Sequence, residues 1–568
     1  MGAKVNLDLS KKVSYKLLTE IFILLTFGLA LLSCEARNGV TNEAEQANLS
    51  KPLLPDQPNI LWLVAEDLSP IIPPFGDNTV DTPNLSRLAR EGVRYTRVFS
   101  PSGVCAPSRA AIATGKYQNS IGALHMRTSS VSAFAPGTFT PYEAVPPAGV
   151  KMHSEYFRAA GYYASNNSKE DYQFSKTVTA WDESSITAHW RNRAPGQPFF
   201  SIFNFSVTHE SQVWARAGQP LLVDESLDVP IPPYLPDTEI AKKDIRRVYS
   251  NIVALDQQLG NILDQLEEDG LLENTIIFFY SDHGGPLPRQ KRMLYDSGMN
   301  LPLIIRFPDK WRAGEVDDQL ISFVDFKSTA LSLVNIKPPG YVDGRAFLGV
   351  YANSPERRYV HGAADRFDEL HDTIRAVRDK RFKYLRNYFP ERGYYMPLKY
   401  REQMPIMQEM LSLRDNNQLT ENQALWFRDE KDPIELFDTE NDPHELNNLA
   451  GNSEYVDKIT ELSDEMDRWM VEIEDQGLIP EQELVLSLWP GRIQPVTEAP
   501  VAINQSGALV LRSNTEGASI GYQFVDDSTS LSEQWQLYSS ALTIPAGKLL
   551  VTIADRIGYK PSEILVVE

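Results

Sequence analysis

The sequence predicts an α/β protein with a mixed sheet covered by helices on both faces, a smaller antiparallel sheet, and a C-terminal β-sandwich. Continuous apolar runs such as Asn59–Ala65 (NILWLVA) predict strands buried on both faces. Amphipathic helical patterns alternate with these runs, as expected for a helix-covered sheet. After about residue 355, apolar and polar residues alternate instead, which is typical of strands with one solvated face.

The elements of the first part follow in order. Thr82 and Pro83 predict the N-cap and first residue of a helix that ends near Gly92. Apolar residues at helical spacing predict a helix within Val248–Leu266. Further buried strands are predicted at Phe199–Phe205 (FFSIFNF), Thr275–Tyr280 (TIIFFY) and Leu301–Arg306.

The changes in composition predict five segments. Residues 373–387 predict antiparallel strands, 454–471 an amphipathic helix, and the proline-rich stretch 489–500 a linker. The predicted boundaries are 1–33 for a lipoprotein signal peptide, 34–57 for a flexible tether, 58–354 for the large α/β domain, 355–488 for the antiparallel-sheet subdomain with its C-terminal helix, and 501–568 for the β-sandwich. Trp535 and Tyr538 in the last segment are candidates for a sugar platform or for core packing.

The N-terminal residues have the features of an export signal. Four lysines precede the apolar run Ile21–Leu32, which is short for a membrane span. Leu31–Cys34 (LLSC) resembles a bacterial lipobox, in which the chain is cut before the cysteine and acylated, for example with palmitate. We therefore expect an exported protein anchored through Cys34 to a bacterial membrane, periplasmic or on the outer-membrane surface. A plain signal peptide with an incidental cysteine is the alternative.

Charge and cysteine content restrict the partners. The formal net charge of −21 disfavours nucleic acid. It would also disfavour an anionic substrate unless basic residues gather at the site. The only cysteines are Cys34 and Cys105, so no internal disulfide is expected if Cys34 carries lipid.

Three predicted strands run directly into polar clusters. Glu66 and Asp67 follow the first, Thr208 and His209 the second, and Asp282-His283 the third. Because ligands bind beyond the carboxyl ends of the strands in such sheets, the clusters are expected to meet. Their oxygen-rich donors suit Ca²⁺, or Mg²⁺, better than zinc. Taken singly, each cluster is more often a cap or a turn, and it is their combination with the motif below that favours a metal site.

The segment Cys105–Arg109 (CAPSR), which continues as AAIATGKY, carries a specific motif. It resembles the hallmark of the type I sulfatase family, C-x-P-S-R followed by T-G-[RK]. A buried, inert Cys105 would not explain the adjacent proline, serine and arginine. The stretches DTPNLSRLAREG, TIIFFYSDHG and ELFDTENDPHELNNLA also resemble that family, which implies an alkaline-phosphatase-like fold from Pro58 to about Leu449.

The resemblance implies that Cys105 is oxidised to formylglycine by a formylglycine-generating or anaerobic sulfatase-maturating enzyme. One hydroxyl of the aldehyde hydrate then attacks sulfur, and the other expels sulfate. The implied metal ligands are Glu66, Asp67, Cys105, Asp282 and His283, and the implied catalytic residues are Cys105, Arg109, Lys169, Asp171, His209 and Lys291.

Two positions depart from the family pattern. Glu66 stands where the family normally has aspartate, so its place among the ligands is less secure than that of Asp67. Asp171, in Lys169-Glu170-Asp171, replaces a usual histidine. A carboxylate can still accept the hydroxyl proton, although Asp171 is also explained as a turn residue.

The substrate class implied is a sulfated polysaccharide or its oligosaccharides, such as ulvan or a glycosaminoglycan, cleaved at a sulfate ester or an N-sulfate. Candidate substrate-binding residues are His125, Arg127, Arg366 and Arg375, for each of which a structural role is at least as well supported. The alternatives are a phosphoester or phosphonate hydrolase of the same superfamily and a non-catalytic glycan-binding lipoprotein.

Overall fold

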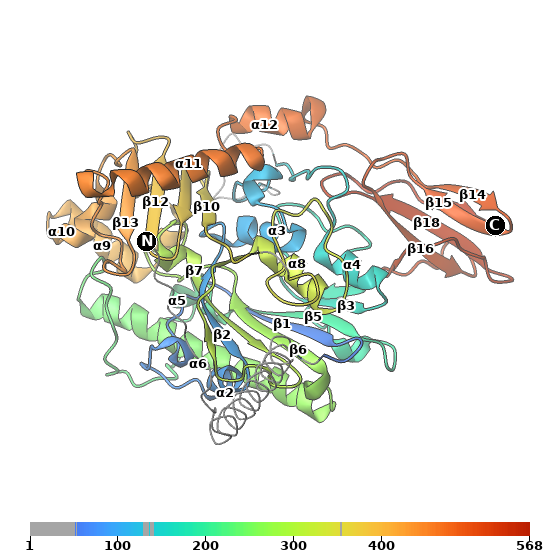
Figure 1. Ribbon diagram of the computed structural model, residues 1–568, viewed down its shortest axis with the longest axis horizontal. Coiled ribbons are helices and arrows are strands. Elements are labelled where there is room, and N and C mark those ends of the chain that lie inside the picture. The colour runs from blue at the N-terminus through green and yellow to red at the C-terminus, as the bar shows by residue number, and fades with distance from the viewer. Residues whose placement is uncertain (1–51, 53, 129–135, 137–140, 353–354, 568) are drawn as a thin grey trace, which may run out of the picture. The chain divides into compact units, whose positions relative to one another are not determined.

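A mixed sheet forms the centre of the computed structural model, which describes residues 52, 54–128, 136, 141–352 and 355–567 (Figure 1). β1 (Asn59–Ala65) lies between β5 (Phe199–Phe205) and β6 (Thr275–Ser281) and is parallel to both. β7 (Asn300–Arg306) is antiparallel to β6, which makes the sheet mixed, as predicted. The other strands are β2 (Val93–Phe99), β3 (Tyr163–Asn167), β4 (Glu183–Ser185), β8 (Val316–Asp317) and β9 (Ile321–Ser322), and the order is β4-β3-β5-β1-β6-β7-β2-β8, with β9 paired to β2.

Helices cover both faces of this sheet (Figure 1). Alternate side chains of β1 enter two hydrophobic cores: Trp62 belongs to one and Leu63 to the other. The continuous apolar run therefore reflects burial on both faces. The core around Trp62 includes α3 (Cys105–Thr114), α4 (His153–Ala159) and α8 (Val324–Leu333), and the core around Leu63 includes α2 (Pro83–Glu91) and α6 (Glu239–Glu268).

The structure extends one predicted helix toward its N-terminus and confirms the predicted start of another. α6 begins nine residues before Val248, at Glu239, after Thr238 accepts a capping hydrogen bond from the Ala241 N–H. Its first turns are mostly polar, so the apolar pattern marked only the later part. Thr82 occupies the N-cap position of α2, but its side chain makes no capping bond. Asp256 of α6 caps α2 instead, since it accepts from the Leu85 N–H at 2.8 Å.

The second sheet is antiparallel, as predicted. Its strands are β10 (Val360–Ala364), β11 (Ile374–Arg378), β12 (Phe382–Asn387) and β13 (Ile434–Asp438), and α11 (Val456–Glu472) packs on it. The remaining α-helices are α5 (Ser211–Ala215), α7 (Asp296–Met299), α9 (Pro405–Asp415), α10 (Glu421–Ala424) and α12 (Glu481–Leu488). Short 3₁₀ helices lie at Pro73–Phe75, Gln118–Ser120, Trp190–Asn192, Ser206–Thr208, Leu272–Asn274, Arg401–Gln403, Leu425–Phe427, Ser453–Tyr455 and Pro490–Arg492.

The C-terminal module contains two antiparallel sheets that share a hydrophobic cluster, in agreement with a sandwich. One sheet pairs β14 (Val501–Gln505) with β15 (Ala508–Arg512), and the other contains β16 (Ser519–Val525), β17 (Gln536–Leu537), β18 (Leu549–Asp555) and β19 (Leu565–Val567). Trp535 is buried in the module's core, and the Tyr538 hydroxyl accepts from the Leu511 N–H at 3.1 Å. Both side chains therefore serve packing.

The predicted signal peptide, Cys34 and nearly all of the predicted tether lie outside the described residues. Within the described part of the chain, none of the helices has both the length and the apolarity needed to cross a bilayer.

Candidate active site

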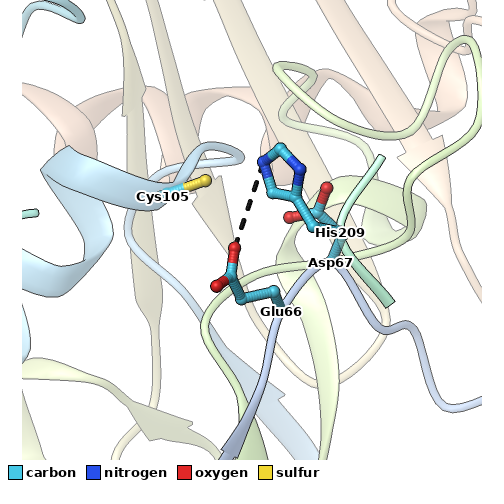
Figure 2. A group of neighbouring side chains, drawn as sticks. All are labelled: Glu66, Asp67, Cys105 and His209. Atoms are coloured by element: carbon cyan, nitrogen blue, oxygen red, sulfur yellow. Dashed lines mark ion pairs between the residues drawn. The ribbon is translucent and has the colours of Figure 1, made fainter. Parts of the chain in front are cut away.

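The carboxyl ends of β5, β1 and β6 bring the predicted polar clusters together. Because β1 pairs in parallel with both neighbours, the residues that follow the three strands emerge at one edge. Figure 2 shows Glu66, Asp67 and His209 grouped opposite Cys105 at the start of α3. The expected convergence is thus present in the structure.

The start of α3 is locked to the end of β6. Ser108 donates to the Asp282 carbonyl at 2.6 Å and also contacts the Ser100 hydroxyl at 2.9 Å. This anchoring brings the Cys105 sulfur within 3.4 Å of His283 Nε2. The serine of the CAPSR motif therefore positions the first turn of the helix, and with it residue 105.

Asp67, Cys105, Asp282 and His283 place one donor atom each within 4.8 Å of one another. Asp67 Oδ2 accepts from the Glu210 N–H and from Lys291, both at 2.7 Å. Oδ1 of the same buried carboxylate lies 3.0 Å from His283 Nε2, and no other described residue donates to it. Oδ1 and Nε2 therefore face each other where the donors gather, and the donor set fits a divalent cation.

His283 is oriented toward the same point. Its Nδ1 lies 3.0 Å from the Gly284 carbonyl, to which it donates, so Nε2 faces Cys105 and Asp67. Burial lowers the pKa of His283, but Asp282 and Asp67 outweigh burial and raise this pKa to about 10. The buried carboxylates thus strongly favour positive charge at this position, which a bound metal ion would also supply.

Glu66 has a different environment from Asp67. Its Oε2 lies 2.6 Å from Lys169 Nζ and 4.0 Å from His209 Nε2. One potential ligand atom from each of Glu66, Asp67, Cys105 and His209 lies within 4.8 Å of the other three. Its carboxylate is therefore close enough to serve as a ligand but is already paired with a lysine.

Cations surround residue 105 on the other sides. Lys291 is buried and contacts Asp67 at 2.7 Å and His209 Nε2 at 3.2 Å. Arg109 donates through Nε to Asp282 at 3.0 Å and through Nη1 to Asn204 at 2.7 Å, while its buried Nη2 has no partner among the described residues. An unpaired guanidinium nitrogen is available to hold an added oxygen.

The electrostatics of the site stabilise an anion at position 105. Burial raises the pKa of the Cys105 thiol, but Lys291 and Lys169 together lower it to about 6. Any negative charge that develops on an atom attached to this residue would meet the same two ammonium groups. The local cation cluster also overcomes the strongly acidic balance of the whole chain.

A cavity of about 310 Å³ opens above these residues. Asp171 lies at its edge with a left-handed backbone (φ 58°) and its carboxylate 3.6 Å from Lys169. The lining comprises Cys105, Met126, Arg127, Lys169, Asp171, Gln173, His209, Glu210, Lys291, Arg292 and Tyr400. All six predicted catalytic residues except Arg109 line this cavity, and Arg109 contacts Asp282 directly beneath it.

Sequence reasoning missed a buried charge network beside the cavity. Glu210 contacts Lys291 at 3.3 Å and accepts two hydrogen bonds from Arg292, at 2.9 and 2.8 Å. Arg292 continues to Asp368 at 2.7 Å. Glu210 and Arg292 directly follow His209 and Lys291 in the sequence, which was the only available signal. Tyr400, from the long connection between β12 and β13, had no such signal.

Two predicted substrate-binding arginines need correction. Arg375 has no exposed surface and pairs with Asp365 and Asp475. Arg366 is buried and pairs with Glu481 at 2.6 Å. Their charges are already neutralised within the protein, and neither residue lines the cavity.

The other two candidates differ from each other. His125 is fully buried, does not line the cavity, and accepts at Nδ1 from the Arg366 N–H. Burial lowers the pKa of His125 to about 3, so its ring is neutral. Arg127 does line the cavity, where its guanidinium lies over the Tyr400 ring at 5.0 Å while pairing with Asp368. Only Arg127 among the four is placed to touch a ligand there.

Comparison with known proteins identifies close relatives. The Sulfatase family model matches residues 58–336, and the model for the C-terminal region of N-sulphoglucosamine sulphohydrolase matches residues 289–424. An ulvan-active sulfatase of Formosa agariphila is 53% identical over 546 residues, covering 90% of this chain and 91% of that protein. Human N-sulphoglucosamine sulphohydrolase is 25% identical over 469 residues, covering 73% of this chain and 90% of that protein.

A solved structure supports the fold. It is a protein in complex with its substrate D-glucosamine-2-N,6-O-disulfate, with a TM-score of 0.55 and 17% identity, and the match covers 75% of this chain and 100% of that one. At that identity the likeness concerns the fold.

Proposed function

Because this chain belongs to the sulfatase family and is a sulfuric ester hydrolase, we propose that it removes sulfate from ulvan or ulvan oligosaccharides. The observation that carries this choice is the 53% identity to an ulvan-active sulfatase along 90% of the chain. The match to the N-sulphoglucosamine sulphohydrolase C-terminal model, which includes Lys291, keeps N-sulfated glycosaminoglycan as the second candidate.

A divalent metal, which we propose is Ca²⁺, would be held by Asp67, Asp282 and His283, with Glu66 and residue 105 completing the shell. Asp67 Oδ1, to which no described residue other than His283 donates, and the orientation of His283 support this assignment. When bound, such an ion polarises sulfate oxygens and favours ionisation of an attacking hydroxyl. Mg²⁺ is the alternative for the same oxygen-rich site.

We propose that Cys105 is converted to formylglycine by a dedicated maturating enzyme. The hydrated aldehyde supplies one hydroxyl to attack sulfur and a second to release sulfate. Arg109 Nη2, which is buried without a partner, would then hold an oxygen of the modified side chain. Burial raises the pKa of the Cys105 thiol, but Lys291 and Lys169 outweigh it and lower that pKa. The same two charges would stabilise an oxyanion at this position.

The remaining side chains divide the proton transfers and charge stabilisation. Lys169 and Lys291 would bind the sulfate oxygens as charge accumulates. Burial and Lys291 lower the pKa of His209, but Asp67 and Cys105 outweigh them and raise it. His209 can therefore keep a proton for the leaving sugar oxygen. Asp171, 3.6 Å from Lys169, would accept the proton of the second hydroxyl.

We also propose that the protein is exported and anchored by lipid at Cys34, in the periplasm or at the cell surface. The basic N-terminus and the LLSC sequence support this location. It would place the enzyme where a large polysaccharide or its fragments are available. Metabolic labelling with a fatty acid, compared between the native chain and Cys34→Ala, tests the anchor, which is rejected if both are labelled equally.

The function is tested by measuring free sulfate released from ulvan oligosaccharides, N-sulfated heparan oligosaccharides, and paired aryl sulfate and aryl phosphate. The expected result is sulfate release from ulvan oligosaccharides that disappears in Cys105→Ala. A preference for heparan fragments would show that the substrate is an N-sulfated glycosaminoglycan. A preference for the aryl phosphate would show that the enzyme is a phosphoester hydrolase. Mass spectrometry of the peptide containing Cys105 adds a separate test, because an unmodified thiol in the active protein excludes the formylglycine proposal.

A further inference from the structure

A second cavity, which we call the arginine cavity, lies at the far end of α3. It occupies about 350 Å³, and its lining includes Arg345, Arg357, Arg358 and Arg468 together with the acids Asp343, Glu465 and Glu472. It shares no lining residue with the catalytic cavity. A ten-residue α-helix is about 15 Å long, so the cavity is separated from Cys105 by the length of α3.

Arg345 carries a charge that the protein leaves uncompensated. Its side chain is partly buried and makes no hydrogen bond or ion pair with any described residue. Asp325, whose charge acts on Arg345, is already engaged through both oxygens by Arg357. Burial and then Arg357 lower the pKa of Arg345, as expected for a cation beside another cation. A guanidinium that is partly removed from water in this way can gain an anionic ligand as its partner.

The arginines at the rim are also accessible. The side chains of Arg358 and Arg468 are 75% and 55% exposed and pair with glutamates on α11. Exposed pairs such as that of Arg358 contribute only about 0–1 kcal/mol, so Arg358 can exchange its glutamate for an anionic group of a ligand at little cost. Glu465, the partner of Arg468, is 10% exposed and also contacts His361 at 2.9 Å, so it stays in place.

An aromatic wall completes the cavity. The Trp469 ring stacks on His361, with centroids 4.8 Å apart, and meets Tyr117 edge-on at 5.1 Å. Trp469 is 2% exposed, and its indole N–H has no acceptor among the described residues. The cavity is therefore bounded by an aromatic side chain as well as by guanidinium groups.

We propose that the arginine cavity is a second binding site for an anionic saccharide unit, bearing sulfate or a uronate carboxylate, of the polymeric substrate. Its volume lies within the range of small-molecule sites, about 300–1,000 Å³, and an inorganic anion would leave most of it unfilled. Guanidinium groups bind sulfate-like and carboxylate oxygens in pairs. Binding of one unit here raises the local concentration of the rest of the polymer near the enzyme. This inference rests on the proposed function, because it assumes a sulfated polysaccharide.

The test compares Arg345→Glu with Arg512→Glu, an identical charge change at an exposed residue of β15 that does not line the cavity. We expect Arg345→Glu to raise KM about 5- to 10-fold for the polymer and to leave turnover of a small aryl sulfate unchanged. Arg512→Glu should leave both unchanged. Equal effects of the two variants, or none on the polymer, overturn the proposal.

A binding experiment separates the possible ligands. Full-length Cys105→Ala protein, titrated with a sulfated ulvan oligosaccharide, should show two sites, and the double variant with Arg345→Gln one site. A desulfated oligosaccharide should not bind the second site. Occupation of that site by inorganic sulfate as tightly as by the oligosaccharide overturns the saccharide assignment. If the enzyme without any substitution releases no sulfate from any substrate, the proposed function has failed. If Arg345→Glu keeps both its aryl sulfate turnover and its kinetics on the polymer, only the second site is rejected.

Discussion

Lys291 and Arg375 are both buried cations held by acidic partners, yet their surroundings differ. Lys291 contacts Asp67 and still lines the open catalytic cavity. Arg375, in the second sheet, is enclosed by Asp365 and Asp475 and has no exposed surface. The comparison shows that a buried charge becomes available for chemistry only when part of it faces space that a substrate can enter. Elsewhere it contributes to the architecture of the protein.

Metal removal should have the largest effect on the catalytic side of this comparison. Exhaustive chelation is expected to lower sulfate release by about 1,000-fold, because a divalent ion supplies several kcal/mol of charge stabilisation. Added Ca²⁺ should restore activity. The control is the same chelator saturated with Ca²⁺. Full activity in protein shown by elemental analysis to be metal-free would reject the metal site.

Removing each cation separates their roles directly. Lys291→Ala should lower kcat about 100- to 1,000-fold, as the loss of one transition-state charge contact does. Arg375→Ala should instead destabilise the fold by about 3–5 kcal/mol, since it leaves two buried carboxylates unpaired. Steady-state kinetics and urea denaturation measure the two effects.

The outcome that contradicts this assignment is a reversal. If Arg375→Ala, assayed where it is fully folded, loses as much kcat as Lys291→Ala, the arginine takes part in the reaction. A conservative Arg375→Lys variant provides the matched control, because it keeps the charge while losing the two-pronged geometry.

Asp244, a buried acid of α6 that does not line the catalytic cavity, should make the stability of the protein depend on pH. Burial raises the pKa of Asp244 to about 7, while the Ile406 N–H, at 2.7 Å from its carboxylate, lowers it. A pKa above the unfolded value means that stability falls as pH rises from about 4 to 7. Asp244→Asn should therefore be more stable than the native chain by about 2–4 kcal/mol at pH 8 and nearly equal to it at pH 4.

Thermal unfolding at several pH values measures this difference. Asparagine can still accept the hydrogen bond from Ile406, so the variant isolates the ionisation. A difference between the two proteins that does not change with pH would show that Asp244 does not titrate in this range.

Asp171 should give the smallest effect. Asp171→Asn is expected to lower kcat about 10-fold, below the usual range for a general base, because water can reach a side chain that is 36% exposed. KM should change little. Asp171→Glu, which keeps the carboxylate, serves as control, and an unchanged kcat in Asp171→Asn would assign Asp171 to the turn alone.

Much of the candidate site was predictable because its signals are local. Asp67 and Asp282 directly follow buried apolar strands, and neighbouring parallel strands end at one edge. Cys105 lies in a motif of five ordered residues. Glu210 and Arg292 could not be predicted, since their importance depends on contacts with each other across 82 positions.

The sequence by itself determined four central strands, the helices α2 and α6, and the sulfatase motif at Cys105, because apolar periodicity and short motifs are written in neighbouring residues. Only the tertiary structure decided which charges are neutralised and which face a cavity. Arg127 and Arg375 look alike in the sequence, yet one lines the catalytic cavity and the other is sealed between two carboxylates. The physical reason is that electrostatic pairing depends on distance in space, which residues far apart in the chain acquire only on folding.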